Sequence, residues 1–323
     1  MTTIISQQAL IHQLSDPMLT EALSVVSGCN HVVVDVTEAS VWPTSLRLPA
    51  CPVIAVGGQD DFCDISVKTD EIDELTAAIN RQPVAAATLV QVLRHNVAAS
   101  ITDGLMAESL AYSALQQSSG FRRWCEEQPT LHVRTDALSN IDKPVLITER
   151  QGECYTITLD RPDKHNAYCE ALKDALCEAL QVPMLDLSIK EIRIHGNGKS
   201  FCAGGDLSEF GAVTDAAVAH LSRMTRSAAP LIASMRDRVR VKLHGACIGA
   251  GIELPAFAGV TAARSDAFFQ LPEVAMGLIP GAGGTVSICK RIGKSRTAYM
   301  ALTNRRIDAE TALQWGLVDE LIA

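Results

Sequence analysis

Aromatic residues and positive charge are both scarce in this chain of 323 residues. Aromatic side chains make up 4% of the sequence, and the formal net charge at pH 7 is −9. Proteins that bind nucleic acid usually carry a basic surface, and many add aromatic rings on which bases stack. The sequence therefore argues against nucleic acid as the main partner.

Cysteine is present but lacks the paired spacing of metal or redox centres. None of the ten cysteines occurs in a Cys-x-x-Cys pair. Scattered thiols of this kind are typical of reduced cytoplasmic proteins and not of disulfide frameworks or zinc sites. We therefore predict a cytoplasmic protein without a metal centre.

Long apolar runs are missing as well. A membrane-spanning helix needs about 20 mainly apolar residues, and no window of this sequence offers them. The first residues, MTTIISQQALIHQLSD, also lack the basic start and apolar run of a secretory signal. We expect no membrane partner.

The composition that remains suits a folded α/β protein. Hydrophobic residues make up 47% and charged residues 20%, and the length allows about two domains. The β-branched runs HVVVDV (31–36) and CPVIAVGG (51–58) predict buried strands. Amphipathic stretches predict helices, such as 102–118, where Thr102 or Asp103 is a suitable N-cap. Alternation of predicted strands with predicted helices favours parallel strands joined by helices.

A polar, irregular stretch at 126–144 separates two regions of different character. We interpret it as a linker, and predict an N-terminal α/β and helical region over 1–140 and a second region over 141–323. The second region opens with two alternating runs within 145–162, which is the pattern of a β-hairpin.

Two glycine-rich turns share one layout. FCAGGDL (201–207) follows the predicted strand IKEIRIHG (189–196), and HGACIGAGIEL (244–254) follows VRVKLHG (239–245). Small residues let a ligand approach the backbone, and the N–H groups at a helix start are free. Side by side, the turns would supply two donors to one oxygen, as in an oxyanion hole. Taken alone, each motif favours a tight strand-to-helix turn that binds nothing.

Two glutamates, Glu253 and Glu273, lie in apolar, glycine-rich surroundings. Carboxylates are seldom buried unless they are paired or used. Glu253 lies about one helical turn inside the second glycine turn, between Ile252 and Leu254. Two carboxylates near one oxyanion site can divide the work of acid and base. A surface glutamate or a structural ion pair is the alternative, and it is stronger for Glu273.

These motifs, in this order, resemble the crotonase family, also called the enoyl-CoA hydratase/isomerase family. The resemblance covers residues 145–323 and rests on the segments ITLDRPDKHNAY, FCAGGDL, HGACIGAGIEL, FFQLPEVAMGLIPGAGGT and GKSRTAYMALTNRRIDAETALQWGLVDELI. It implies an α/β fold with a crotonase-like spiral of ββα units, an acyl-CoA thioester substrate and a place in fatty acid metabolism. It also implies a homo-oligomer, a trimer or dimer of trimers, and no cofactor beyond the coenzyme A of the substrate.

The resemblance implies roles for individual residues. The amides of Gly205 and Ala250 would be the oxyanion donors. Glu253 would handle the water that adds at C3, and Glu273 would deliver a proton to C2. Because isomerases of the family usually keep only the second glutamate, the presence of both favours hydration of a 2-enoyl-CoA to a 3-hydroxyacyl-CoA.

Coenzyme A is expected near the RPDKHNA turn. The resemblance places its adenine end against the backbone around Cys202 and Ala203, and makes Asp206 a further binding candidate. Lys164 could approach a phosphate, although an ordinary solvated turn lysine is an equal alternative.

The sequence departs from the family pattern in four places. Gln270 stands where a small residue is usual, and Gly259 where an acidic residue is usual. Pro255 follows Glu253 by two positions and can bend its helix. Family members also continue for several helices beyond GLVDELI, whereas this sequence ends at Ala323.

The stretch 61–124 resembles those absent C-terminal helices. It has the expected order of a strand, a helix, a proline-started helix and a helix with a GL-x-x-E pattern, which ends at Glu108. We therefore predict that the N-terminal region supplies the family's C-terminal helices, as in a circular permutation or a decayed tandem copy. Residues 1–60 would then be remnants of the first copy's strands. An unrelated α/β extension is the alternative.

Two functional alternatives stay open. The same fold supports other enolate reactions, such as double-bond isomerisation, thioester hydrolysis or decarboxylation. From a different class, a non-catalytic acyl-CoA-binding or scaffolding subunit is also compatible, because Gln270 and Gly259 break the family pattern.

Overall fold

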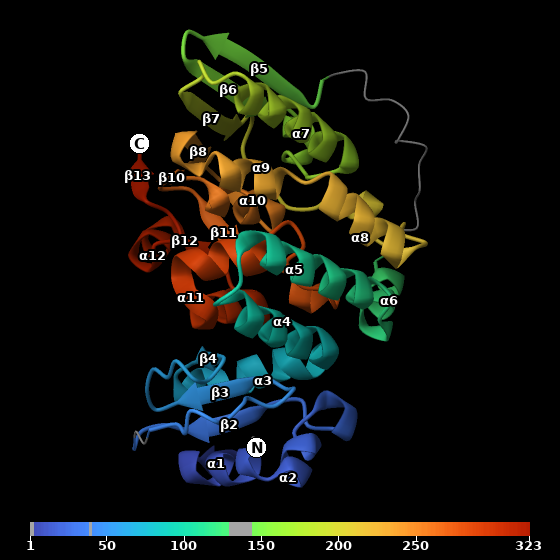
Figure 1. Cartoon of the computed structure of the whole chain (residues 1–323), viewed down its shortest axis with the longest axis vertical. Helices are drawn as coiled ribbons and strands as arrows, with labels where there is room; N and C mark the ends of the chain where they lie inside the picture. Colours follow the sequence, from blue (N-terminus) through green and yellow to red (C-terminus); the bar gives the residue numbers. More distant parts are fainter. Residues whose placement is uncertain (1–2, 39–40, 129–143) are drawn as a thin grey trace.

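The computed structural model describes residues 3–38, 41–128 and 144–323. Strands and helices are interspersed along the chain, and the strands form three sheets with helices packed around them (Figure 1). The predicted α/β class is confirmed. The predicted boundary at 140/141, and most of the linker around it, lies outside the described residues.

A six-stranded sheet forms the frame of the second region. Its first two strands are the predicted antiparallel hairpin. The other neighbours all pair in parallel. In spatial order the strands are β5 (Leu146–Gln151), β6 (Cys154–Leu159), β7 (Glu191–Gly196), β8 (Val239–Leu243), β10 (Val260–Arg264) and β13 (Glu320–Ile322). Because β7 and β8 run the same way, the two glycine-rich turns begin at the same edge of this sheet.

A smaller sheet and a set of helices surround this frame. The sheet consists of β9 (Ala246–Ile248), β11 (Phe268–Gln270) and β12 (Ile307–Asp308). The helices are α7 (Glu170–Leu185), α8 (Ala216–Thr225), α9 (Ala228–Ser234), α10 (Ala250–Glu253), α11 (Gly284–Thr303) and α12 (Ala309–Trp315). Helix α11 is interrupted at Gly293, where φ is +82°.

The N-terminal region begins with a four-stranded parallel sheet. Its strands are β1 (Ile4–Ser6), β2 (Val32–Asp35), β3 (Val53–Val56) and β4 (Ile65–Ser66). Alternate residues of β2 and β3 enter different cores, as the two-residue period of a strand requires. Val34 packs in a small cluster with Leu10 of α1 (Gln7–Ser15), whereas Val33 and Ile54 face the main core.

Helices α2 (Pro17–Ala22), α3 (Ile72–Arg81), α4 (Pro83–Asn96), α5 (Ile101–Gln116) and α6 (Ser119–Glu126) complete the region. The predicted cap of α5 is wrong. Ser100 caps this helix, since its Oγ accepts a hydrogen bond from Asp103 N at 3.1 Å, so that Thr102 and Asp103 already belong to the first turn.

One hydrophobic core joins the N-terminal helices to the sheet region. Leu89 of α4 and Ile79 of α3 belong to the same contiguous cluster as Leu172 of α7 and Ile288 of α11. Helix α4 packs along α11, and α5 packs against both α8 and α11, as Figure 1 shows near the middle of the molecule. The two regions therefore share a core.

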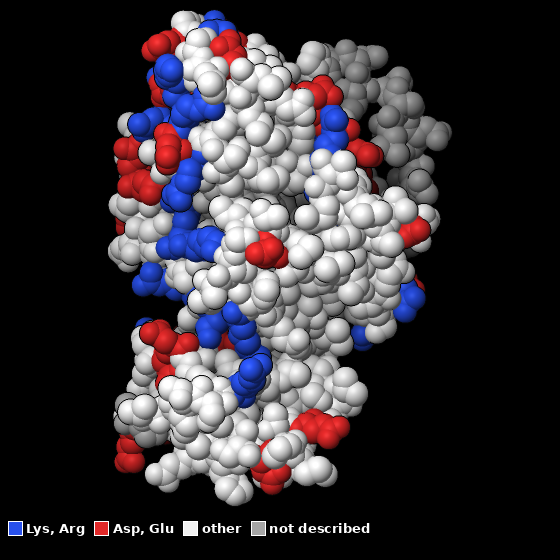
Figure 2. Space-filling model, in the orientation of Figure 1, with Lys and Arg blue, Asp and Glu red and all other residues white. Residues whose placement is uncertain are grey.

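Surface charge on the face shown in Figure 2 is unevenly distributed. Lys and Arg side chains gather over the side where β8, β10 and α11 lie, with acidic side chains beside them, and the surface over α5 and α8 is largely uncharged.

The shared core predicts that a substitution in α4 destabilises the whole molecule. Leu89→Ala should lower the free energy of unfolding by about 2–5 kcal/mol, because it leaves a cavity at a site with no solvent exposure. Urea unfolding followed by circular dichroism measures this. Val84→Ala, in the same helix but 50% exposed, is the control and should change stability by about 0.5 kcal/mol or less. A second transition that leaves the sheet region intact would contradict the shared core.

Candidate active site

The two glycine-rich turns lie side by side. Cys202 N donates a hydrogen bond to Ala246 O at 3.1 Å, and Cys202 O accepts one from Ile248 N at 3.0 Å. This short parallel pairing brings Gly205 and Ala250 to the wall of one cavity of about 620 Å³.

The amides of Gly205 and Ala250 are available to a ligand. Neither donates a hydrogen bond to any other residue in the described part of the chain. Ala250 is the first residue of α10, where a backbone N–H has no partner within the helix. Two free amides in one cavity wall provide the donors of an oxyanion hole.

Glu253 is buried at the end of α10 and is held by the start of α11. Its Oε2 accepts hydrogen bonds from Ala282 N at 2.7 Å and Gly284 N at 2.9 Å. The approach is so close that a Cβ on residue 284 would lie 2.6 Å from Glu253 Cγ. Only glycine therefore fits at position 284.

Glu273 faces the same space from another element. It begins the 3-10 turn Glu273–Met276, and its Oε2 is buried without a hydrogen-bond partner in the described residues. A Cβ on Gly249, which has φ +50°, would lie 2.4 Å from Glu273 Oε1 and 3.7 Å from Glu253 Oε1. The two carboxylates thus flank Gly249, next to the free amide of Ala250.

A third carboxylate, Glu108, comes from α5 of the N-terminal region. Its Oε1 accepts from Gly283 N at 2.7 Å, and its Oε2 accepts from Thr285 N at 2.9 Å and Thr285 Oγ1 at 2.6 Å. Four consecutive amides at 282–285 are thereby divided alternately between Glu253 and Glu108. The sequence singled out Glu108 only as part of a helix pattern and gave no sign of this contact.

The three buried carboxyl groups differ in their protonation. Burial raises the pKa of Glu253 to about 7, against two amide hydrogen bonds that lower it. Burial, with the nearby charge of Glu253, raises the pKa of Glu108 to about 8. Burial and then Glu253 raise the pKa of Glu273 well above its ordinary value. Glu253 is therefore the readiest of the three to ionise, and the surroundings of Glu273 favour its protonated form.

The sequence model of the enoyl-CoA hydratase/isomerase family matches residues 149–323. This chain belongs to that family. The predicted crotonase-superfamily membership is confirmed.

Relatives and solved structures with enoyl-CoA hydratase names resemble this member of the family. The 2,3-dehydroadipyl-CoA hydratase of Escherichia coli K12 is 36% identical over 182 residues, which cover 54% of this chain and 68% of that protein. The mitochondrial enoyl-CoA hydratase of Pongo abelii is 34% identical over 185 residues, covering 54% of this chain and 61% of the relative. The enoyl-CoA hydratase structure from Thermoplasma volcanium has a TM-score of 0.52 and 33% identity, covering 56% of this chain and 73% of that one.

Of the residues predicted to contact coenzyme A, only Asp206 lines the cavity. Asp206 lines the cavity, but its carboxylate forms an ion pair with Arg161 at 3.0 Å. Lys164 is exposed in the 3-10 turn Pro162–Lys164, outside the cavity lining. Both backbone groups of Cys202 are used in pairing, and the amide of Ala203 is also bonded. Because burial raises the pKa of the Cys202 thiol to about 12, this thiol is a poor nucleophile.

The departures from the family pattern have local explanations. Gln270 points to the end of α11, where its Nε2 donates to the carbonyl and side-chain oxygens of Asn304 at 2.8 Å. A Cβ on Gly259 would lie 2.5 Å from Arg236 O, which leaves no room for an acidic side chain. Pro255 begins a separate 3-10 turn directly after α10, so Glu253 keeps its helical position.

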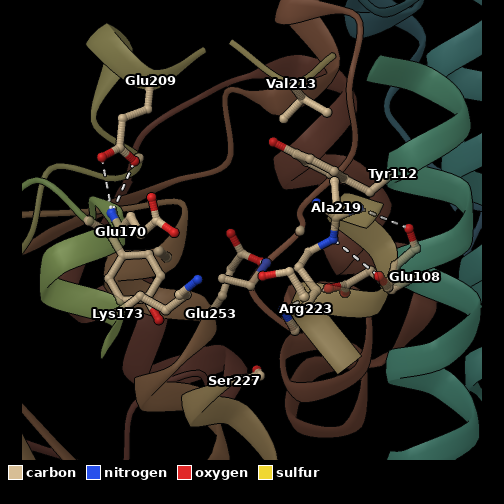
Figure 3. Close-up of a pocket in the computed structure, with 18 of the residues that line it drawn as sticks. Glu108, Tyr112, Glu170, Lys173, Glu209, Val213, Ala219, Arg223, Ser227 and Glu253 are labelled. Carbon is tan, nitrogen blue, oxygen red and sulfur yellow. Dashed lines mark hydrogen bonds between the residues drawn. The ribbon is translucent and has the colours of Figure 1, made fainter. Parts of the chain in front are cut away.

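The remaining cavity wall has two sides. Figure 3 shows Glu253 between them: one side carries Glu170, Lys173 and Glu209, and the other carries Glu108, Tyr112 and Arg223. Sequence analysis missed Tyr112 and Arg223. They lie on α5 and α8, and no local motif marks either helix as part of a site.

The described residues include neither a metal-binding cluster nor a membrane-spanning helix. No group of three or more His, Cys, Asp or Glu side chains is placed to hold a metal ion in residues 3–38, 41–128 and 144–323. Over the same ranges, no helix has both the length and the apolar character needed to cross a membrane.

The buried carboxyl groups predict a stability that decreases with rising pH. The folded-state pKa of Glu108, about 8, exceeds the ordinary value of 4.5. Its stabilising proton is therefore fully bound below pH 4.5 and is lost as the pH rises through about 8. Urea unfolding of the wild type and of Glu108→Gln across this range measures the effect. The variant should show a shallower decline, because all other titrating groups are common to both proteins. Equal slopes would mean that Glu108 is ionised throughout.

Proposed function

We propose that this family member is an enoyl-CoA hydratase that reversibly adds water to a 2-enoyl-CoA to give a 3-hydroxyacyl-CoA. The observation that carries the proposal is the pair of buried carboxyl groups of Glu253 and Glu273, which flank Gly249 beside two free amides. Family membership and the hydratase names of its relatives support the same reaction.

Stabilisation of the enolate is the first requirement of this reaction. The amides of Gly205 and Ala250 would donate to the thioester oxygen, on which negative charge develops when water adds at C3. Donors fixed by the backbone need no reorganisation as the charge forms. The loss of one such donor typically raises the barrier by about 3–4 kcal/mol.

Proton transfer is the second requirement. Glu253 would act as the base, since two amide hydrogen bonds favour its charged form. It would take a proton from water as the water oxygen bonds to C3 and the double-bond electrons move toward the carbonyl oxygen. Glu273 would then give its proton to C2 as the enolate collapses. A carboxyl group with a buried, unpartnered oxygen favours its protonated form.

Other parts of the expected picture stay predictions. Coenzyme A would enter as part of the substrate, and the steps above use only side chains and amides of this chain. We also propose a trimer or dimer of trimers, a cytoplasmic location and a role in fatty acid metabolism, all by analogy with the family.

We also propose that the N-terminal region replaces the family's C-terminal helices. Helices α4 and α5 pack on α11, and Glu108 of α5 binds the turn that orients Glu253. An unrelated extension would not be expected to hold a catalytic glutamate in place. If the proposal is right, Glu108→Gln lowers the turnover number as well as stability.

Both glutamates should be needed for hydration. Glu253→Gln and Glu273→Gln should each lower the turnover of crotonyl-CoA by about 10²–10⁴-fold, because each removes one acid–base group. The loss of enoyl-thioester absorbance, with chromatographic detection of the 3-hydroxy product, measures this. Glu178→Gln, which changes an exposed glutamate of α7, is the control. Products without the hydroxyl would indicate isomerisation or hydrolysis, and binding without turnover of any enoyl-CoA would indicate a non-catalytic subunit.

The rate should also depend on pH around neutrality. Because Glu253 must be ionised to act as a base, kcat/KM should decrease as the pH falls through about 7. It should decrease again at higher pH, where Glu273 loses the proton it delivers. Initial rates with crotonyl-CoA across the stable pH range give the profile. A flat profile across neutrality would contradict the assignment of Glu253 as base.

A further inference from the structure

Arg223 is a cation in the cavity wall that lacks an acidic partner. It lies near the end of α8 and lines the cavity that contains Glu253. Its Nε donates to Ser109 Oγ at 3.1 Å, and its Nη2 donates to Ser109 O at 3.4 Å and to Ser113 Oγ. Within residues 3–38, 41–128 and 144–323 it forms no ion pair, so only neutral oxygens of α5 hold it.

The neighbouring Arg226 is held differently. Arg226, three residues further along, binds both Asp174 at 2.6 Å and Glu178 at 2.7 Å. The nearest candidate for Arg223 would be Glu108, but the oxygens of Glu108 accept hydrogen bonds from the 283–285 turn. In a chain with a net charge of −9, a partly buried arginine without a carboxylate suggests that a ligand supplies one.

Tyr112 adds a second polar group at the same place. The guanidinium carbon of Arg223 lies 4.9 Å from the centre of the Tyr112 ring, a cation–π contact that fixes both side chains. The Tyr112 hydroxyl lies in the cavity wall and makes no hydrogen bond to other described residues. Burial raises the pKa of Tyr112 above its ordinary value, so the hydroxyl stays a neutral donor. Burial lowers the pKa of Arg223, but an arginine in a protein remains charged.

The position of this pair identifies which end of a substrate it meets. Figure 3 places Arg223 and Tyr112 on one side of Glu253, and Glu209 on the other. Asp206, the one coenzyme A candidate that lines the cavity, is next to Glu209 in the turn that follows the first glycine motif. With coenzyme A on the Asp206 side of the cavity, Arg223 would lie beyond the reacting carbons, on the side that the acyl chain would reach.

We propose that Arg223 and Tyr112 bind a carboxylate at the far end of the acyl chain, so that the preferred substrates are ω-carboxylated 2-enoyl-CoA thioesters. Nε and Nη2 of Arg223 already donate to serines, which leaves Nη1 for the ligand. A charge-assisted hydrogen bond from Nη1, together with one from the Tyr112 hydroxyl, would hold the carboxylate. A purely aliphatic chain would desolvate this charge without pairing it. This inference rests on the proposed function, because it takes the acyl chain to lie in the same cavity.

Binding of saturated thioesters tests the inference without requiring catalysis. The probes are a saturated acyl-CoA, its ω-carboxylated counterpart of equal chain length, and coenzyme A alone, each titrated by calorimetry. The wild type should prefer the ω-carboxylated thioester, and Arg223→Gln should reduce that preference by about 10- to 100-fold, since a hydrogen bond to a charged group is lost. Arg223→Lys should retain part of the preference.

Two more variants separate recognition from folding. Tyr112→Phe removes one hydroxyl and keeps the ring, so it should reduce the preference by about 2- to 10-fold with little change in melting temperature. Arg193→Gln removes an arginine that lies outside the cavity lining and already pairs with Glu191 at 2.9 Å, and it should leave the preference unchanged. Equal affinity of the wild type for both thioesters, or an equal loss of affinity for coenzyme A alone in Arg223→Gln, would overturn the inference.

Turnover of the matching 2-enoyl thioesters distinguishes this inference from the proposed function. Hydration of both thioesters with a preference for the ω-carboxylated one supports the two together. Hydration of both without a preference overturns the carboxylate site and leaves the hydratase standing. A binding preference without hydration of either overturns the hydratase and leaves the carboxylate site supported.

Discussion

The site depends on four consecutive backbone amides at the start of α11 and on their division between two carboxylates. Ala282 and Gly284 donate to Glu253, and Gly283 and Thr285 donate to Glu108. The hydrogen bonds to Glu253 hold its carboxylate beside the oxyanion amides. The hydrogen bonds to Glu108 hold α5 against the cavity. Removal of either carboxylate would leave buried N–H groups unsatisfied. The turn at 282–285 thus both positions Glu253 and attaches the N-terminal helices to the sheet region.

This arrangement also explains why three buried glutamates differ in pKa. Glu253, Glu273 and Glu108 are all buried and close enough to influence each other's charge. Between Glu253 and Glu273, hydrogen bonds contribute to the difference, because Glu253 receives two amide donors whereas one oxygen of Glu273 receives none in the described residues. Glu108 also receives two amide donors, but burial and the nearby charge of Glu253 outweigh them. A cluster of this kind cannot hold three negative charges at low cost. At least one carboxyl group of the cluster therefore keeps its proton. In the proposed reaction Glu253 is the ionised base and Glu273 is the protonated acid.

Local pattern was enough to predict much of the fold and half of the site. Strand β2, the hairpin and the two glycine turns carry their signals within a few residues, so the juxtaposition of Gly205 and Ala250 could be expected from the sequence. Arg223 and Tyr112 could not, because α8 and α5 meet only in three dimensions and their serine contacts span 114 residues. The cap of α5 was misplaced since Ser100, Thr102 and Asp103 are all good capping residues. Only the backbone conformation of Ser100 decides among them.

The long separation between Glu108 and its turn has a consequence for synthesis of the protein. Gly283 lies 175 residues after Glu108, which at about 5–20 residues per second takes the ribosome roughly 9–35 s to add. During that interval α4 and α5 have left the ribosome with the apolar faces that later contact α11 uncovered. The carboxylate of Glu108, which is buried in the folded protein, is still exposed to water at this stage. The apolar faces of these helices therefore stay exposed until translation of α11 is complete.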